Sequence, residues 1–157
     1  MRTRYAARAV VIDRDGRTLL FRATMPGHPL RVFWITPGGG LKPGEDEPAC
    51  VMREVFEETG LSEFELGPCV WRRDHTFRWG DGWLRQVEAY YVIQADAFEV
   101  NRDNHEEAER DFLGAHRWFS LEELRAHDEP LVPSRLADLL EPLLSGRYPD
   151  APIEVGP

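Results

Sequence analysis

The 157-residue sequence predicts a mixed α/β layer protein. Three observations lead to this fold class: three strand-like segments precede a central helical segment, two longer strand-like segments follow it, and further helices come near the end of the chain. This order differs from the repeating strand and helix units of a doubly wound fold. The sequence also contains neither the GxGxxG loop nor the GxxxxGK[ST] loop of common nucleotide-binding folds.

The first three segments are predicted to be strands. Apolar runs at residues 5–12 and 18–22 flank the turn signal Asp15-Gly16, which predicts a β-hairpin. After a loop rich in proline and glycine, the β-branched and aromatic residues 31–36 predict a third strand. Residues 37–46 contain three consecutive glycines and are predicted to form a loop.

The central helix is predicted between a cap at Asp46 or Glu47 and an end at Gly60. At 100° per residue, one face of this helix is expected to pack against the rest of the protein. The residues of that face are Pro48, Met52, Val55, Phe56 and Thr59. The other face carries three carboxylates, Glu54, Glu57 and Glu58, so it is expected to be acidic.

The remainder of the chain is predicted to add two strands and two helices. Residues 69–77 and 84–95 have strand character and are joined by a tight connection that contains glycine. The polar residues 101–111 precede a short helix capped by Ser120, and a last helix runs from Pro133 to about Ser145. We expect a single domain over residues 1–157, with a loosely ordered tail from about residue 147.

Charge and composition restrict the expected partners. A net charge of -9 and a pI near 5.0 disfavour duplex nucleic acid and anionic membrane surfaces, although a small anionic substrate can still be captured locally. The sequence has no segment suited to span a bilayer and no signal peptide. Cys50 and Cys69 form no CxxC pair, so neither a zinc site nor a disulfide framework is indicated. A cytoplasmic protein is therefore expected.

Glu54, Glu57 and Glu58 stand at helical spacings i, i+3 and i+4, where like charges repel. Two of them also lie near the C-terminal end of the helix, where the helix dipole disfavours negative charge. The summed cost of about 1 to 2 kcal/mol is small beside a typical stability of about 5 to 15 kcal/mol, so a solvated acidic face is one explanation. A hard divalent cation such as Mg²⁺, which takes carboxylate and phosphate oxygens, is the other.

The spacing around the carboxylates is more specific than the carboxylates themselves. Gly39 is followed by five residues, Glu45 and seven further residues, and then by the run REVFEETGL from Arg53 to Leu61. At every defined position this pattern matches the Nudix box, Gly-x5-Glu-x7-Arg-Glu-U-x-Glu-Glu-x-Gly-U, in which U is aliphatic. The sequence therefore resembles the Nudix hydrolase family, whose members include MutT-like proteins.

The resemblance implies an α/β/α sandwich with a mixed β-sheet. It also implies a metal-dependent hydrolase that uses Mg²⁺ or Mn²⁺ to cleave the pyrophosphate linkage of a nucleoside diphosphate linked to another moiety. Carried over by position, Glu54, Glu57 and Glu58 are the implied metal ligands, together with the backbone carbonyl of Gly38. Arg53 is the implied residue that orients these glutamates.

The other site candidates rest on weaker patterns. The general base is either a box glutamate or an acidic residue of the later polar segment, where Glu107 is chosen over Glu106 and Glu109, and a solvated loop is the alternative. The catalytic candidates are Glu54, Glu57, Arg53 and Glu107. The substrate-binding candidates are Gly39, Gly40, Arg73 and His75. Strand alternation alone explains Arg73 and His75 equally well as an outward face.

The expected partner is a small-molecule nucleotide or diphosphate, and a homodimer is left open. Motifs that mark several Nudix subgroups are missing, which leaves nucleoside triphosphates and nucleotide sugars as substrates. The competing hypothesis is a non-catalytic Nudix-fold module that binds or senses nucleotides. That hypothesis predicts losses among the three box glutamates, and all three are present.

Overall fold

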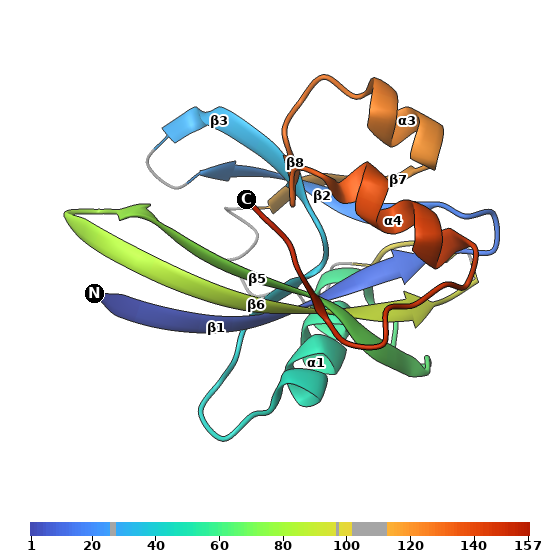
Figure 1. Ribbon diagram of the computed structural model, residues 1–157, viewed down its shortest axis with the longest axis horizontal. Coiled ribbons are helices and arrows are strands. Elements are labelled where there is room, and N and C mark those ends of the chain that lie inside the picture. The colour runs from blue at the N-terminus through green and yellow to red at the C-terminus, as the bar shows by residue number, and fades with distance from the viewer. Residues whose placement is uncertain (26–27, 97, 102–112) are drawn as a thin grey trace.

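The computed structural model describes residues 1–25, 28–96, 98–101 and 113–157, and its elements are shown in Figure 1. The strands are β1 (Arg2–Ile12), β2 (Thr18–Met25), β3 (His28–Ile35), β4 (Gly38–Gly40), β5 (Leu66–Trp79), β6 (Gly82–Gln94), β7 (Leu113–Phe119), β8 (Leu131–Val132) and β9 (Ile153–Glu154). The helices are α1 (Glu47–Thr59), α3 (Leu121–Ala126) and α4 (Leu136–Leu144).

The strands form one mixed sheet in the order β8-β3-β2-β1-β6-β5-β9, with β4 paired to β1 and β7 paired to β2. The long strands β1 and β6 run parallel, whereas β1 with β2 and β5 with β6 are antiparallel. Helix α1 lies on one face of the sheet, and α3 and α4 lie on the other (Figure 1). The α/β/α sandwich expected from the sequence is therefore confirmed.

Two apolar cores hold these three layers together. Side chains alternate between the faces of β1, so this strand contributes to both cores. Toward α1 it contributes Ala7, Ala9 and Val11. Toward α4 it contributes Val10 and Ile12. The helix residues that complete the cores are Cys50, Val51 and Val55 of α1 and Leu136, Leu140 and Leu143 of α4.

The predicted hairpin and helix boundaries are confirmed where local chemistry sets them. In the first turn, the Asp13 carboxylate accepts hydrogen bonds from the backbone N–H groups of Asp15 and Arg17 at 2.9 and 2.8 Å. Asp46 caps α1 by accepting from the N–H of Ala49 at 2.9 Å. Gly60 ends α1 in the left-handed conformation, with φ of 81°.

The predicted loop over residues 37–46 is wrong for Gly38–Gly40, which form strand β4 against β1. Gly38–Gly40 form a strand because the space between β1 and α1 is too narrow for side chains. A Cβ on Gly38 would lie 2.5 Å from the carbonyl oxygen of Ala7, and one on Gly39 would lie 2.6 Å from the carboxylate of Glu54. Three residues without side chains can therefore pair with β1 beneath the helix, where larger residues cannot.

The predicted packing face of α1 is also partly wrong. Met52 and Phe56 were expected to pack, yet they are 45% and 40% exposed. Glu54 and Glu58 were expected on an acidic outer face, yet they are 2% and 1% exposed. Helix α1 is turned so that these two carboxylates meet the glycines of β4, while Val55 enters the core.

The C-terminal region differs from the expectation in two ways. Helix α4 begins at Leu136 instead of Pro133, because residues 133–135 form a turn in which the N–H of Leu136 donates to the carbonyl of Pro133 at 3.0 Å. The tail was expected to be loose, but β9 pairs with β5, and the N–H of Val155 donates to the carbonyl of Arg72 at 2.8 Å. The predicted cap Ser120 is confirmed at the start of α3. Among the helices of the described residues, none has the length and apolar character to cross a membrane.

Candidate active site

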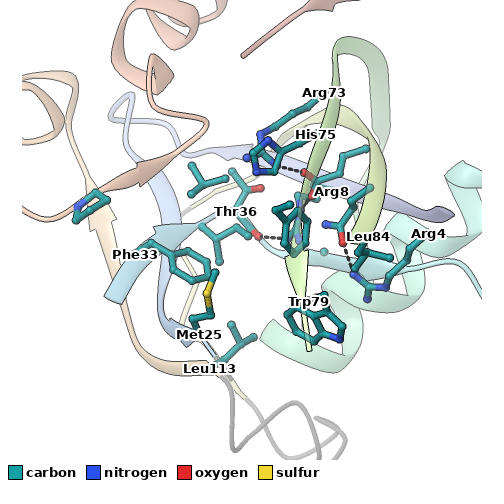
Figure 2. Close-up of a pocket in the computed structure, with 18 of the residues that line it drawn as sticks. Arg4, Arg8, Met25, Phe33, Thr36, Arg73, His75, Trp79, Leu84 and Leu113 are labelled. Carbon is teal, nitrogen blue, oxygen red and sulfur yellow. Dashed lines mark hydrogen bonds and ion pairs between the residues drawn. The ribbon is translucent and has the colours of Figure 1, made fainter. Parts of the chain in front are cut away.

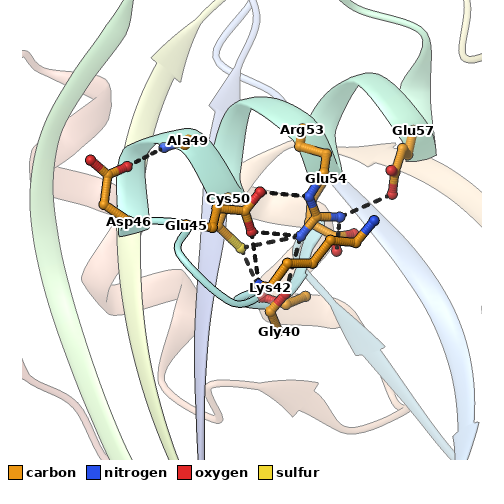
Figure 3. Close-up of polar contacts among 10 residues, drawn as sticks. Gly40, Lys42, Glu45, Asp46, Ala49, Cys50, Arg53, Glu54 and Glu57 are labelled. Carbon is orange, nitrogen blue, oxygen red and sulfur yellow. Dashed lines mark hydrogen bonds and ion pairs between the residues drawn. The ribbon is translucent and has the colours of Figure 1, made fainter.

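Arg53 is the centre of the polar contacts on α1. Its guanidinium donates to Glu45 at 2.8 and 2.9 Å, to Glu54 Oε1 at 2.8 Å and to Glu57 Oε2 at 3.2 Å. It also donates to the carbonyl of Gly40 at 3.1 Å (Figure 3). One side chain therefore fixes three box carboxylates, those of Glu45, Glu54 and Glu57, and attaches β4 to the helix. This geometry agrees with the orienting role that the family resemblance implied for Arg53.

The charges around Arg53 stabilise one another. Hydrogen bonds from Arg53 lower the pKa of Glu45 to about 2, and the same bonds raise the pKa of Arg53. Cys50 behaves differently, because burial, and then the charges of Glu45 and Glu54, raise the pKa of its thiol to about 11. The thiol donates to the carbonyl of Gly39 at 3.3 Å, so Cys50 helps to hold β4.

Two box glutamates face the glycine strand instead of solvent. Glu58 accepts from the N–H of Gly38 at 3.3 Å. Glu54 is in contact range of Gly39, and its Oε2 atom is buried without a hydrogen-bond partner in the described part of the chain. A buried oxygen in this state costs roughly 1 to 3 kcal/mol, which a hydrogen-bond donor or a cation would recover. The oxygen-rich donor set fits Mg²⁺ or Mn²⁺.

A cavity of about 870 Å³ opens beside this part of the box, within the size range of small-molecule sites. Gly38, Gly39 and Glu58 line the end of the cavity that belongs to the box. The lining contains five arginines and two glutamates, a net formal charge of +3 in a chain of net charge -9. The arginines are Arg2, Arg4, Arg8, Arg31 and Arg73. A small anion is therefore attracted to this place on an otherwise acidic protein.

Strand β5 sends every second side chain into the cavity, from Arg73 through His75 and Phe77 to Trp79. The rings of His75 and Phe77 are stacked, with centroids 5.2 Å apart. Figure 2 shows Arg73, His75 and Trp79 around the same space as Met25 and Phe33. Burial, and then the charge of Arg73, lower the pKa of His75, which favours the neutral imidazole. The structure therefore brings Arg73 and His75 together in the cavity.

Of the charged residues in the cavity wall, sequence reasoning named only Arg73 and Glu58 as candidates. Among those it missed are Arg8 of β1 and Glu88 of β6. The side chain of Glu88 is 0% exposed and forms ion pairs with Arg8 and with Arg73, the latter at 2.6 Å. Burial by itself raises the pKa of Glu88, but the two guanidiniums outweigh burial, and the pKa lies below its usual value. The available signal was a charge inside each of two apolar strand segments, which is rare without a partner.

Comparison with known proteins decides the family. A family model described as the NUDIX domain matches residues 2–140. The chain belongs to the Nudix family. Nudix hydrolase 25 of Arabidopsis thaliana is 30% identical, with 54% of each chain covered. The RNA pyrophosphohydrolase of Erythrobacter litoralis is 26% identical, with 66% of this chain and 68% of that protein covered. This Nudix chain spans about half the length of the Arabidopsis relative.

Solved structures agree with the Nudix assignment. A MutT protein from Methanosarcina mazei Go1 has a TM-score of 0.64 at 20% identity, covering 92% of this chain and 94% of that one. A MutT NUDIX hydrolase from Burkholderia pseudomallei has a TM-score of 0.59 at 27% identity, covering 90% of this chain and 98% of that one. The family and the fold predicted from the sequence are therefore confirmed.

Some expectations for this Nudix protein stay predictions. Within the described residues, no three His, Cys, Asp or Glu side chains are already arranged to hold a metal ion. Arg53 instead occupies oxygens of Glu54 and Glu57. The candidate base Glu107, with Glu106 and Glu109, lies outside the residues that the structure describes.

Proposed function

We propose that this Nudix protein is a metal-dependent hydrolase that cleaves the pyrophosphate linkage of a nucleoside diphosphate linked to another moiety. The observation that carries the proposal is the junction between the box and the cavity. There the buried, unpartnered oxygen of Glu54 and the carboxylate of Glu58 lie against a strand of glycines that lines an arginine-rich cavity. Hydrolysis of a diphosphate needs a cation site and a phosphate site next to each other.

The box residues would hold the cation. Glu54, Glu57 and Glu58, with the carbonyl of Gly38, would bind Mg²⁺ or Mn²⁺, which when bound offsets phosphate charge and acidifies water. Arg53 holds two of these carboxylates in place, because its guanidinium donates hydrogen bonds to Glu54 and to Glu57.

Gly38 and Gly39 present no side chain between the box and the cavity, so a phosphate can approach the carboxylates closely.

The cavity supports a small nucleotide as substrate. Arginines on its walls can bind phosphate oxygens, and the aromatic row of His75, Phe77 and Trp79 offers rings on which a base can stack. Nucleoside triphosphates and nucleotide sugars both meet these requirements. The relatives with MutT and RNA pyrophosphohydrolase names support the same reaction class.

The test is turnover by the wild type and by Glu57→Gln. Nucleoside triphosphates, nucleotide sugars, ADP-ribose and dinucleoside polyphosphates are incubated with Mg²⁺ or Mn²⁺, and the products are separated by anion-exchange chromatography. Because Glu57 has a proposed role as ligand and catalytic residue, its amide variant should lose about 100-fold or more in kcat/KM. The matched control is Glu47→Gln, since Glu47 lies on the same helix but contacts Arg72 and Tyr91 outside the cavity.

Two results would count against the proposal. If Glu57→Gln stays within a few-fold of the wild type, the assignment of Glu57 is wrong. If the wild type hydrolyses no compound of the panel with either metal, the competing hypothesis of a nucleotide-binding module without catalysis replaces it.

A further inference from the structure

We infer that Arg8 and Arg73 form an anion subsite for a phosphate group of the substrate, and that Glu88 is the positioning residue that holds both arginines. This inference rests on the proposed function, because it assigns the place of a phosphate next to the reacting linkage. Three neighbouring strands supply the residues: β1 supplies Arg8, β6 supplies Glu88 and β5 supplies Arg73. We call this set the Arg8-Glu88-Arg73 triad.

The sheet register places the triad on one face. Arg73 is the direct cross-strand partner of Glu88. Arg8 lies two positions from Ala6, which is the partner of Glu88 on β1. Because side chains two positions apart share a face, one carboxylate reaches both guanidiniums. Figure 2 shows Arg8 and Arg73 at the cavity, with the dashed contacts that hold them.

Both guanidiniums keep donors for a ligand. Arg8 uses Nε for Glu88 and Nη1 for the carbonyl of Thr36 at 3.1 Å. Arg73 uses Nη1 for Glu88 and Nε for the carbonyl of Gly156 at 3.3 Å. In the described part of the chain, Nη2 of neither arginine donates a hydrogen bond. Each side chain is 8% exposed and lines the cavity, so both arginines are accessible to a ligand there.

The charge of the triad favours an anion. Two guanidiniums face one carboxylate, so a positive charge remains in a buried wall where it is costly to leave uncompensated. Glu58, the other acidic residue of the cavity lining, belongs to the box and is a proposed ligand of the cation. A phosphate oxygen is the group that would balance the triad with charge-assisted hydrogen bonds.

The position of Arg8 relates the subsite to the box. A Cβ on Gly38 would lie 2.6 Å from Cγ of Arg8, so Arg8 is packed directly against the glycine that borders the box. A phosphate on Arg8 is therefore beside the box carboxylates, and Arg73 is on the side of His75 and the aromatic row. We assign the subsite to the phosphate that joins the reacting linkage to the rest of the nucleotide.

The test measures inorganic pyrophosphate binding in EDTA by isothermal titration calorimetry at low ionic strength. Metal removal separates the subsite from the proposed function, because the box carboxylates alone do not attract an anion. Wild type should bind, and Arg73→Gln should bind about 10-fold or more weakly through the loss of charge-assisted hydrogen bonds. Arg72→Gln is the control, since Arg72 stands on the same strand, is 40% exposed and pairs with Glu47.

Two further variants separate position from charge. Arg73→Lys keeps the charge but loses the planar fork, so it should also bind about 10-fold more weakly. Glu88→Gln adds one positive charge to the cavity, yet it should weaken binding if Glu88 positions the arginines. Circular dichroism and thermal unfolding identify folded variants, and Arg73→Lys carries the test if Glu88→Gln does not fold. With substrate, Arg73→Lys should raise KM more than it lowers kcat.

The subsite is wrong if the wild type does not bind pyrophosphate in EDTA, or if both Arg73 variants bind as tightly as wild type. The positioning role is wrong if Glu88→Gln folds and binds more tightly, because charge alone then explains the attraction. If no compound of the panel is hydrolysed but wild type binds pyrophosphate more tightly than the Arg73 variants, the proposed hydrolysis is wrong and the anion subsite is supported.

Discussion

Gly39 and Glu54 are single residues whose contact sets the geometry of the box. Gly39 is part of β4, and Glu54 is 2% exposed on α1. The family motif requires both residue types, and the structure gives a physical reason. The helix and the strand are close enough that the carboxylate lies where a larger residue would place its Cβ.

We expect Gly39→Ala to destabilise the protein and to reduce turnover. The added Cβ would lie 2.6 Å from Glu54 Oε1, so the carboxylate or the strand must move. Overpacking of this kind costs roughly 1 to 3 kcal/mol, which chemical denaturation measures. The control is Gly82→Ala, because a Cβ there meets nothing within 4 Å and should change stability by less than about 0.5 kcal/mol. Equal denaturation midpoints for Gly39→Ala and Gly82→Ala would contradict the close contact between Gly39 and Glu54.

At the scale of elements, local sequence signals were sufficient to predict where helix α1 begins and ends, but they did not reveal which of its faces is buried. The cap at Asp46 and the end at Gly60 depend on hydrogen bonds within a few residues, so the sequence predicted them correctly. The buried face of α1 depends on β4 and β1, which lie apart from it in the chain. Apolar Met52 and Phe56 therefore misled the prediction, and Glu54 and Glu58 took the interior positions.

The corrected face of α1 can be tested by paired truncations. Val55→Ala should destabilise by roughly 2 to 3 kcal/mol, because Val55 is fully buried and its removal leaves space in the core. Met52→Ala removes more atoms but should cost less than about 1 kcal/mol, since Met52 is 45% exposed. Urea unfolding of the two variants measures both free energies. If Met52→Ala lowers the free energy of unfolding more than Val55→Ala does, the packing face predicted from the sequence is the correct one.

For the whole molecule, the family motif made the fold class and the box predictable, while the cavity wall was not. The box is contiguous in sequence, so its spacing could be recognised. The Arg8-Glu88-Arg73 triad joins residues 80 and 15 positions apart, and only strand pairing brings them together. Arg73 was named as a candidate because a strand and a basic residue coincided. The antiparallel pairing of β5 with β6 places Glu88 beside Arg73. Arg8 joins them only through the parallel pairing of β1 with β6, which no local pattern reveals.

The acid stability of the molecule should depend on Glu129, which connects distant segments. Hydrogen bonds from Arg22 and Trp34 lower its pKa from 4.5 to about 2. A lowered pKa in the folded state gives stability that is complete above about pH 4.5 and is lost as the pH falls toward 2. Urea midpoints of wild type and Glu129→Gln should therefore differ most at pH 7 and converge as the pH falls toward 2. A constant difference across this range would show that ionisation of Glu129 contributes nothing.

The net charge of +3 in the cavity lining, within a chain of -9, has a consequence for how a ligand arrives. At physiological salt, attraction between charges extends only about 8 Å. A phosphorylated molecule is therefore repelled over most of the surface and drawn in only close to the mouth of the cavity. The direction of approach therefore decides which small anions arrive, whereas polyanions too large to enter the opening meet the negative charge of the surrounding surface.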